Sequence, residues 1–214
     1  MRVVFLGAPG SGKGTQAKRL AQKFNLKHIS TGDILRSAIS ERTSLGIKAK
    51  AYIDGGNLVP DDVMLGMIRE ELTRRRTGFI FDGFPRTRAQ ADGLDVILRE
   101  LGMNLTKVFN LEIPDRVAIE RLEARRVCRN CGQEYNLKTR APKVDAKCDL
   151  CGVDLYRRPD DDAEVINKRL AVYHEKTGSV EDFYRSKGLL ADIDGSGGFD
   201  DVYDSITEAL AGAE

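Results

Sequence analysis

A glycine-rich loop between an apolar segment and a helical segment constrains the fold of this chain most strongly. Residues 3–6 are apolar, the loop reads Gly7-Ala8-Pro9-Gly10-Ser11-Gly12-Lys13-Gly14-Thr15, and a run with helical spacing follows. Glycine permits the positive φ angles and the close backbone approach that wrapping around an anion requires. The first amides of the helix, together with Lys13, attract phosphate groups. We therefore predict a loop that binds a nucleoside triphosphate; the alternative is a tight turn beside an exposed lysine.

The loop departs from the usual phosphate-binding pattern at one position. A serine or threonine ordinarily follows the lysine, and its hydroxyl helps to hold magnesium. Here Gly14 follows Lys13, and Thr15 comes one place later. Direct ligation of magnesium by this loop is therefore not expected.

Composition and charge limit the remaining function classes. With 214 residues, 41% of them hydrophobic and 31% charged, the chain can bury one core and carry a small inserted module. A net charge of +1 gives no broad field that would favour a nucleic acid or a membrane surface as partner. The sequence contains no long apolar run and no export signal at its start, so we expect a cytoplasmic protein.

Short apolar segments alternate with longer amphipathic ones along the chain, which predicts parallel strands joined by crossover helices. Strands are expected at residues 3–6, 28–29, 79–81, 108–113 and 189–193. Helices are expected at residues 15–24, 32–40, 61–74, 88–101, 115–126, 163–176 and 199–210, the second of them capped by Thr31. The predicted fold class is α/β, a doubly wound five-stranded parallel sheet flanked by helices.

All four cysteines lie in one segment that interrupts this alternation. They form two pairs, Cys128-x-x-Cys131 and Cys148-x-x-Cys151, with sixteen residues between the pairs. This spacing is typical of four thiolates around one tetrahedral zinc ion, although disulfides or four inert thiols are the alternatives. Because four cysteine ligands leave no open position on the metal, we expect the zinc to be structural.

The segment that carries the cysteines has two possible roles. A zinc ribbon with basic residues such as Arg125 and Arg126 can bind nucleic acid. However, acidic residues including Asp160-Asp161-Asp162 interrupt the basic ones, and few aromatic side chains beyond Tyr135 and Tyr156 are present to stack on bases. We therefore favour a flap that closes over an active site and keeps water from the transferring phosphoryl group.

A second motif, Asp82-Gly83-Phe84-Pro85-Arg86-Thr87, follows the apolar run at residues 79–81. Ligands bind at the carboxyl edge of open α/β sheets, and this position places a carboxylate there. Asp82 is a candidate for holding magnesium through water, and the planar guanidinium of Arg86 suits a phosphate. The alternative is a capping aspartate beside a solvated arginine.

These residues together resemble the adenylate kinase family. The resemblance is carried by the glycine loop with its Gly-Lys-Gly-Thr ending, Ser30-Thr31-Gly32-Asp33 with Arg36, Leu58-Val59-Pro60, and the Asp82 motif with Gln90. The paired cysteines match the subgroup whose long lid carries zinc. The similarity runs essentially from end to end, including Arg157-Arg158-Pro159-Asp160-Asp161 and Lys168-Arg169-Leu170.

The resemblance implies a monomeric enzyme that reversibly transfers a phosphoryl group from Mg·ATP to AMP, giving two ADP. It implies a core domain of residues 1–29, 60–126 and 161–214, an AMP-binding arm of residues 30–59 and a zinc-binding lid of residues 127–160. The implied ATP-binding residues are Gly10, Ser11, Gly12, Lys13, Gly14, Thr15, Arg121, Arg125, Glu134, Tyr135 and Gly197. The implied AMP-binding residues are Thr31, Arg36, Asn57, Leu58, Val59, Gly83, Phe84, Pro85, Arg86, Gln90, Arg158 and Arg169, with Gln90 expected to recognise the adenine edge.

The residue content fits direct, in-line transfer in a closed cleft. The two histidines, His28 and His174, lie in strand-like and helical runs, so neither is a convincing nucleophile. Neutralisation of the transferring group is assigned to Lys13, Arg86, Arg121, Arg125, Arg158 and Arg169. We expect the lid and the arm to close when both substrates are bound, with backbone changes near Gly55-Gly56 and at residues 160–162.

Three alternative functions remain open at this point. A kinase for uridine or cytidine monophosphate shares the loop and the arginines, but carries asparagine at the position of Thr87 and lacks the long lid with cysteines. A GTP-dependent AMP kinase is closer. A zinc ribbon that binds nucleic acid, controlled by an ATP-dependent switch, is the alternative that is not an enzyme.

Overall fold

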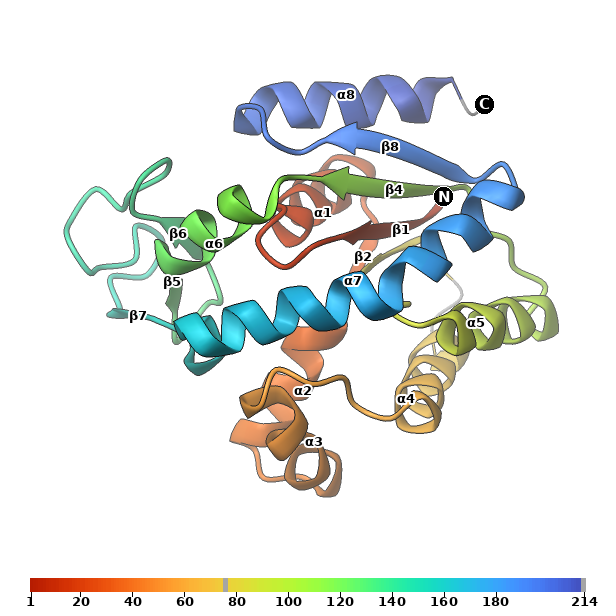
Figure 1. The fold of residues 1–214 in the computed structure, drawn as a ribbon, viewed down its shortest axis with the longest axis horizontal. Coiled ribbons are helices and arrows are strands. Elements are labelled where there is room, and N and C mark those ends of the chain that lie inside the picture. The colour runs from red at the N-terminus through yellow and green to blue at the C-terminus, as the bar shows by residue number, and fades with distance from the viewer. Residues whose placement is uncertain (75–76, 213–214) are drawn as a thin grey trace.

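The predicted fold class is confirmed by the computed structural model. It describes residues 1–74 and 77–212, so positions 75–76 and 213–214 of the expected core domain lie outside the described residues. Five parallel strands form one sheet in the order β2-β3-β1-β4-β8 (Figure 1). The strands are β1 (Arg2–Gly7), β2 (Lys27–Ser30), β3 (Phe79–Asp82), β4 (Lys107–Glu112) and β8 (Leu190–Asp194).

Helices cover both faces of this sheet, and the alternation of side chains along β1 shows how. Val3 and Phe5 pack in the layer of α1 (Lys13–Phe24) and α8 (Phe199–Ala211). Val4 and Leu6 point the other way, into the layer formed by α4, α5 and α7. These helices are α4 (Asp61–Arg74), α5 (Arg88–Glu100) and α7 (Ala163–Ser186). Burial on both faces explains why the strands read as continuous apolar runs.

Two helices between β2 and α4 project from the sheet at the lower edge of Figure 1, namely α2 (Thr31–Ser40) and α3 (Ser44–Asp54). Helix α3 is not predicted from the sequence, because its buried residues are only Gly46 and Ala49, which leave no stripe of large apolar side chains. A Cβ atom at Gly46 would lie 2.0 Å from the carbonyl oxygen of Ala38, so the two helices approach closely. Small residues thus define this contact.

A second, antiparallel sheet in the order β6-β5-β7 lies beyond the carboxyl ends of β4 and β8 (Figure 1). It contains β5 (Arg125–Cys128), β6 (Glu134–Asn136) and β7 (Leu155–Tyr156), and η1 (Pro159–Asp161) follows it. The predicted helix at residues 115–126 was too long: α6 (Asp115–Glu123) ends first, and Arg126 pairs with Tyr135 between strands.

Helix α7 continues to Ser186, ten residues beyond the predicted end at Lys176. Thr177, Val180, Phe183 and Tyr184 are buried, so packing against the sheet maintains the helix past Gly178. Among the helices of residues 1–74 and 77–212, none is both long and apolar enough to cross a membrane.

Candidate functional site

The glycine-rich loop joins β1 to α1 and adopts the conformation expected for anion binding. Gly7, Gly10 and Gly12 have φ angles of 132°, 86° and 94°. A Cβ atom at Gly10 would lie 2.7 Å from the carbonyl oxygen of Ala118, so only glycine fits there. Lys13 bends back over the loop, where its Nζ donates to the carbonyl oxygens of Gly7 at 2.8 Å and Ala8 at 2.7 Å.

The structure supplies a physical reason for Gly14, the position at which the loop departs from the usual pattern. A Cβ atom there would lie 2.9 Å from Oδ2 of Asp82, at the end of the neighbouring strand β3. The same oxygen lies 3.5 Å from Nε2 of His28 on β2. Burial would raise the pKa of Asp82, but His28 and Lys13 outweigh it and the pKa is lowered. Gly14 therefore admits an ionised carboxylate beside the loop.

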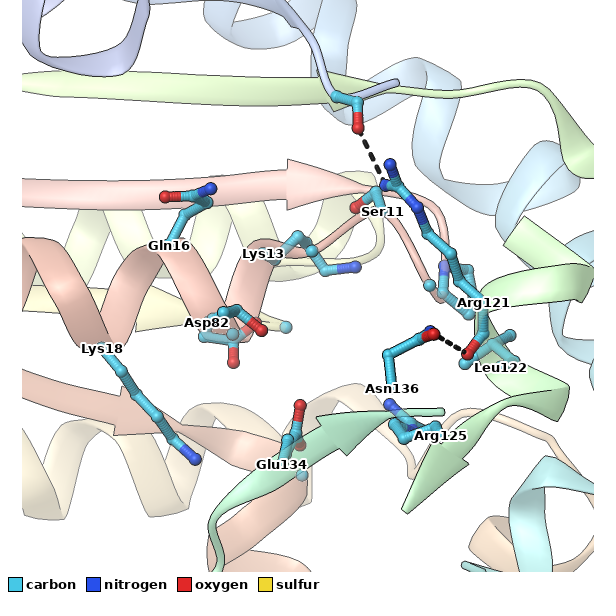
Figure 2. A pocket seen from close by; sticks show the side chains of 18 of the residues that line it. Ser11, Lys13, Gln16, Lys18, Asp82, Arg121, Leu122, Arg125, Glu134 and Asn136 are labelled. Carbon is cyan, nitrogen blue, oxygen red and sulfur yellow. Dashed lines mark hydrogen bonds between the residues drawn. The ribbon is translucent and has the colours of Figure 1, made fainter. Parts of the chain in front are cut away.

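A cavity of about 430 Å³ opens at this loop (Figure 2). Segments from both sheets contribute to it, including β6 and the connection from β8 to α8. Basic side chains outnumber acidic ones in its lining. The basic residues are Lys13, Lys18, Arg36, Arg86, Arg121, Arg125, Arg140, Arg158 and Arg169, and the acidic ones are Asp33, Asp82 and Glu134.

The structure brings together in this cavity all six residues to which neutralisation of the transferring group was assigned. They come from distant parts of the chain: the α1 start, the segment after β3, α6, β5, the segment after β7, and α7. All the residues expected to bind ATP also line it, and Figure 2 shows several of them, including Ser11, Lys13, Arg125 and Glu134.

Carboxylates that the sequence analysis did not assign to the site hold the arginines in place. Fully buried Asp161 accepts from Nε of Arg125 at 2.8 Å and from its Nη2 at 2.5 Å. Asp160 lies 3.1 Å from Nη1 of Arg169. Backbone change at residues 160–162 stays a prediction, and the first two of these residues also anchor arginine side chains. In the sequence these carboxylates belong to an acidic run that follows Arg157, Arg158 and Pro159.

Arg158 connects the second sheet to α2. Its Nη2 donates to Oε1 of Glu134 at 2.5 Å and lies 3.8 Å from Oδ1 of Asp33. Burial would raise the pKa of Asp33, but Arg36 and its neighbours lower it to about 2. Lys18 makes a further connection, because its Nζ donates to the carbonyl oxygen of Gly132 at 3.3 Å. The sequence analysis assigned no role to Asp33 or Lys18.

Burial, reinforced by neighbouring positive charge, lowers the pKa of several basic groups in the cavity. Burial, opposed by Asp82 and reinforced by Arg86, Arg169 and Arg125, lowers the pKa of Lys13 to about 7. Burial is also the main cause that lowers the pKa of Arg169 to about 10. A bound polyanion would relieve this repulsion and favour the charged form of each group. The cavity therefore favours the binding of phosphate groups.

Phe199, Val202 and the backbone of Gly197 and Gly198 form another part of the cavity lining, where the guanidinium of Arg140 lies 5.6 Å from the centre of the Phe199 ring. Arg121 fixes the loop there, because its Nη1 donates to the carbonyl oxygen of Gly195 at 2.8 Å (Figure 2). From α1, Nε2 of Gln16 donates to the carbonyl oxygen of Phe199 at 2.9 Å. The sequence analysis did not identify Gln16. The Phe199 ring and the Arg140 guanidinium can contact a planar, partly apolar group here.

A smaller cavity of about 80 Å³ adjoins the first, because Gly32, Arg36, Gly83, Arg86 and Arg169 line both. The other residues expected at the AMP site that line it are Thr31, Asn57, Leu58, Val59 and Gln90.

The lining of the smaller cavity does not include Phe84, Pro85 or Arg158, which are expected at the AMP site. Arg158 lines the large cavity instead. Phe84 is fully buried in the core beside Phe81, and it lines neither cavity. Pro85 lines a third cavity, of about 70 Å³, together with Arg86 and Arg169. Ser30, rather than Thr31, caps α2 by accepting from the Asp33 amide at 3.3 Å. The Thr31 hydroxyl instead donates to the carbonyl oxygen of Gly83 at 2.9 Å.

The four cysteines converge within the second sheet and its loops, and none is joined in a disulfide. Their Sγ atoms all lie within 4.8 Å of one another, and three of the separations are 3.4, 3.5 and 3.8 Å. A tetrahedral ion with zinc–sulfur bonds of about 2.3 Å would separate its ligands by roughly 3.8 Å. The Tyr135 hydroxyl lies 3.5 Å from Sγ of Cys148. This contact, together with backbone N–H groups, lowers the pKa of that thiol to about 6. The donor set can therefore bind a metal ion.

Neither histidine lies in the charged cavity lining. His28 neighbours Asp82 from β2, and Nε2 of His174 lies 2.9 Å from Oδ1 of Asp115 at the start of α6. Neither appears among the lining residues of the large cavity. Both positions are consistent with the expectation that neither histidine acts as a nucleophile.

Comparisons with known proteins give a consistent result. A model of the family described as adenylate kinase matches residues 5–189. The chain is 50% identical over 212 residues to the adenylate kinase of Thermodesulfovibrio yellowstonii, covering 98% of this chain and 99% of that protein. It is 46% identical to the adenylate kinase of Caldicellulosiruptor bescii, with the same coverage. It is 47% identical to that of Archaeoglobus fulgidus, covering 98% of each chain.

Proposed function

Since this chain belongs to the adenylate kinase family, we propose that it catalyses the reversible reaction of Mg·ATP with AMP to give two ADP by direct, in-line transfer. The observation that carries this proposal is the pair of adjoining cavities with shared cationic walls. Arg36, Arg86 and Arg169 line both cavities. Two phosphorylated ligands bound in these cavities would therefore meet end to end at the same arginines.

The lining of the large cavity supports a specific placement of ATP. Its polyphosphate would lie on the glycine loop and beside Lys13, and its base would lie near Phe199 and the Gly197 backbone. The smaller cavity, which contains Thr31 and Gln90, would hold AMP. Transfer between them needs no covalent intermediate on the protein; it needs fixed positive charge near the oxygens on which charge accumulates.

Closure around both substrates would exclude water as a competing acceptor. We assign residues 30–59 as the AMP-binding arm, residues 127–160 as the lid, and the rest as the core domain. The contact of Arg158 with Asp33 joins the lid to the arm, and that of Lys18 with Gly132 joins the core to the lid. Both support this assignment because they connect the three parts. The site would be complete only when these parts have come together.

Two metal ions belong to this proposal. Adenylate kinases use Mg²⁺ with ATP, and Asp82 fits a role in holding water on that ion because its carboxylate is ionised beside the loop. Magnesium would supply charge neutralisation on the polyphosphate. Zinc would be held by Cys128, Cys131, Cys148 and Cys151, whose Sγ separations fit its tetrahedral geometry. It would stabilise the lid and take no part in the transfer.

A substrate panel tests the proposed reaction. Purified protein is given Mg·ATP with AMP, UMP, CMP or GMP as acceptor, and then AMP with Mg·GTP as donor, while ADP formation is followed. The proposal predicts that ATP with AMP has the highest kcat/KM. A preference for UMP or CMP, or for GTP as donor, would replace it with one of the related kinase activities. Zinc measured on the same sample should be close to one ion per chain.

We further propose that the enzyme is a monomer in the cytoplasm, without nucleic acid or membrane as partner. The near-neutral net charge of +1 supports the absence of a nucleic-acid partner.

A further inference from the structure

We propose that Asp61 is a positioning residue that sets the base specificity of the acceptor site by fixing the orientation of the Gln90 amide. This inference rests on the proposed function, since it concerns the site assigned to AMP. Asp61 lies at the start of α4 and does not line the smaller cavity, whereas Gln90 on α5 does. Asp61 would therefore act from behind the cavity wall.

Two hydrogen bonds hold the Gln90 side chain, which is 2% exposed. Its Oε1 accepts from the backbone N–H of Arg86 at 2.8 Å, and its Nε2 donates to Oδ1 of Asp61 at 2.8 Å. The chemistry of both partners fixes which end of the amide is which. A backbone N–H can only donate, and a carboxylate can only accept. Turning the amide over would place donor against donor and acceptor against acceptor.

The other oxygen of Asp61 is also occupied, which prevents the carboxylate from rotating away. Thr87 Oγ1 donates to Oδ2 of Asp61 at 3.0 Å and accepts from the backbone N–H of Gln90 at 3.1 Å. Thr87 is the N-cap of α5, so the helix start and the carboxylate fix each other. The result is a closed network with one direction for every hydrogen bond.

An amide oxygen can accept two hydrogen bonds, and an amide nitrogen can donate two. After the bonds to Arg86 and Asp61, Gln90 keeps one of each for a ligand. A base with an amino group next to an unprotonated ring nitrogen, as in adenine, matches this pair. Hypoxanthine presents the opposite pattern, a carbonyl next to a ring N–H. It could pair with Gln90 only if the amide turned over, which the contacts with Arg86 and Asp61 prevent. The fixed amide therefore selects AMP against IMP and GMP.

The test compares kcat/KM for AMP and IMP, two acceptors that differ at this edge of the base, in the full-length protein with Mg·ATP. Asp61→Asn keeps the shape of the side chain, but its amide can donate or accept, so one of the two constraints on Gln90 is lost. The expected result is that the AMP-to-IMP ratio falls at least tenfold, a size typical of losing a well-oriented base contact. An unchanged ratio, with both activities lowered equally, would show a merely structural role and overturn the inference.

Asp62→Asn is the matched control. Asp62 is the next residue in the same first turn of α4 and is exposed. The Asp62→Asn variant removes the same charge from the helix start but should leave the AMP-to-IMP ratio of kcat/KM unchanged. If it lowers the ratio as much as Asp61→Asn does, helix charge rather than amide orientation is responsible, and the inference fails.

A measurement on the wild-type protein keeps the inference testable if Asp61→Asn does not fold. If the Gln90 amide is fixed, kcat/KM for IMP should be at least a hundredfold lower than for AMP. The reason is that the polar groups of Gln90 would be left unpaired when IMP is bound. Comparable rates with the two acceptors would overturn the inference alone, since AMP phosphorylation would still support the proposed function. Failure to phosphorylate AMP at all would instead contradict the proposed function.

Discussion

Replacing Lys13 with methionine should change how the stability of the unliganded protein depends on pH. Lys13 lies in the phosphate loop, where burial and the arginines Arg86, Arg169 and Arg125 lower its pKa from 10.5 to about 7. Between these two values the unfolded chain binds a proton on Lys13 that the folded chain has largely lost. The free energy of unfolding therefore rises with pH in this window.

The magnitude follows from the size of the shift. One pKa unit corresponds to about 1.4 kcal/mol, and the folded protein already loses part of the Lys13 proton at pH 7. Lys13 should therefore contribute a gain of about 2 kcal/mol in the free energy of unfolding between pH 7 and pH 9. Methionine has a similar stem and no titrating group, so the variant should lack this part of the gain.

Urea unfolding of both proteins at pH 7, 8 and 9 measures the effect. When the two pH profiles are subtracted, the contributions of groups that titrate in both proteins cancel. The variant also loses the hydrogen bonds from Lys13 to Gly7 and Ala8, but the part of this loss that is independent of pH cancels as well. Lys27→Met, at an exposed position on β2, provides a control that should follow the wild type. Parallel profiles for wild type and Lys13→Met would refute the reasoning that the loop lysine is destabilised by its surroundings.

Four further outcomes are expected. Arg86→Ala should lower kcat by two to three decades, equivalent to about 2.7–4 kcal/mol of transition-state stabilisation; less than a tenfold loss in a folded variant would reject its assignment. Cys148→Ser should reduce bound zinc and lower Tm by about 5 °C or more while activity persists at low temperature; complete inactivity of a folded sample would contradict a structural metal. Gly14→Ala should displace Asp82, costing about 1–3 kcal/mol of stability and raising the Mg²⁺ concentration needed for turnover; unchanged values in both assays would contradict the steric account. A bisubstrate analogue should reduce the radius of gyration measured by X-ray scattering, and an unchanged value would count against closure.

The sequence predicted the main sheet well because its signals are local. The apolar run at residues 3–6 belongs to a strand buried on both faces, and the glycines after it accept φ angles that other residues avoid. Helix α3 was missed because Gly46 and Ala49 form its buried side, so tight packing rather than apolar area stabilises it. The end of α7 was misplaced for a related reason: packing of residues near Phe183 prevails over the weak helix preference of Gly178.

The candidate site was predicted where residues belong to recognisable motifs, and it was incomplete where they act through distant partners. Arg86 and Arg125 were found, but the pairing of Arg125 with Asp161 spans 36 positions along the chain. The bond between Gln90 and Asp61 spans 29 positions and crosses from α5 to α4. No periodicity or spacing encodes such pairs, because each depends on how separate elements are brought together by the fold.

In the proposed mechanism the phosphoryl group passes directly from one nucleotide to the other without bonding to the protein. The stereochemistry at the transferred phosphorus tests it most directly, with ATP made chiral at the γ-phosphorus by oxygen isotopes and AMP as acceptor. A single in-line displacement predicts inversion of configuration in the ADP that is formed. Retention would mean two successive displacements through a phosphorylated side chain, and it would contradict the account.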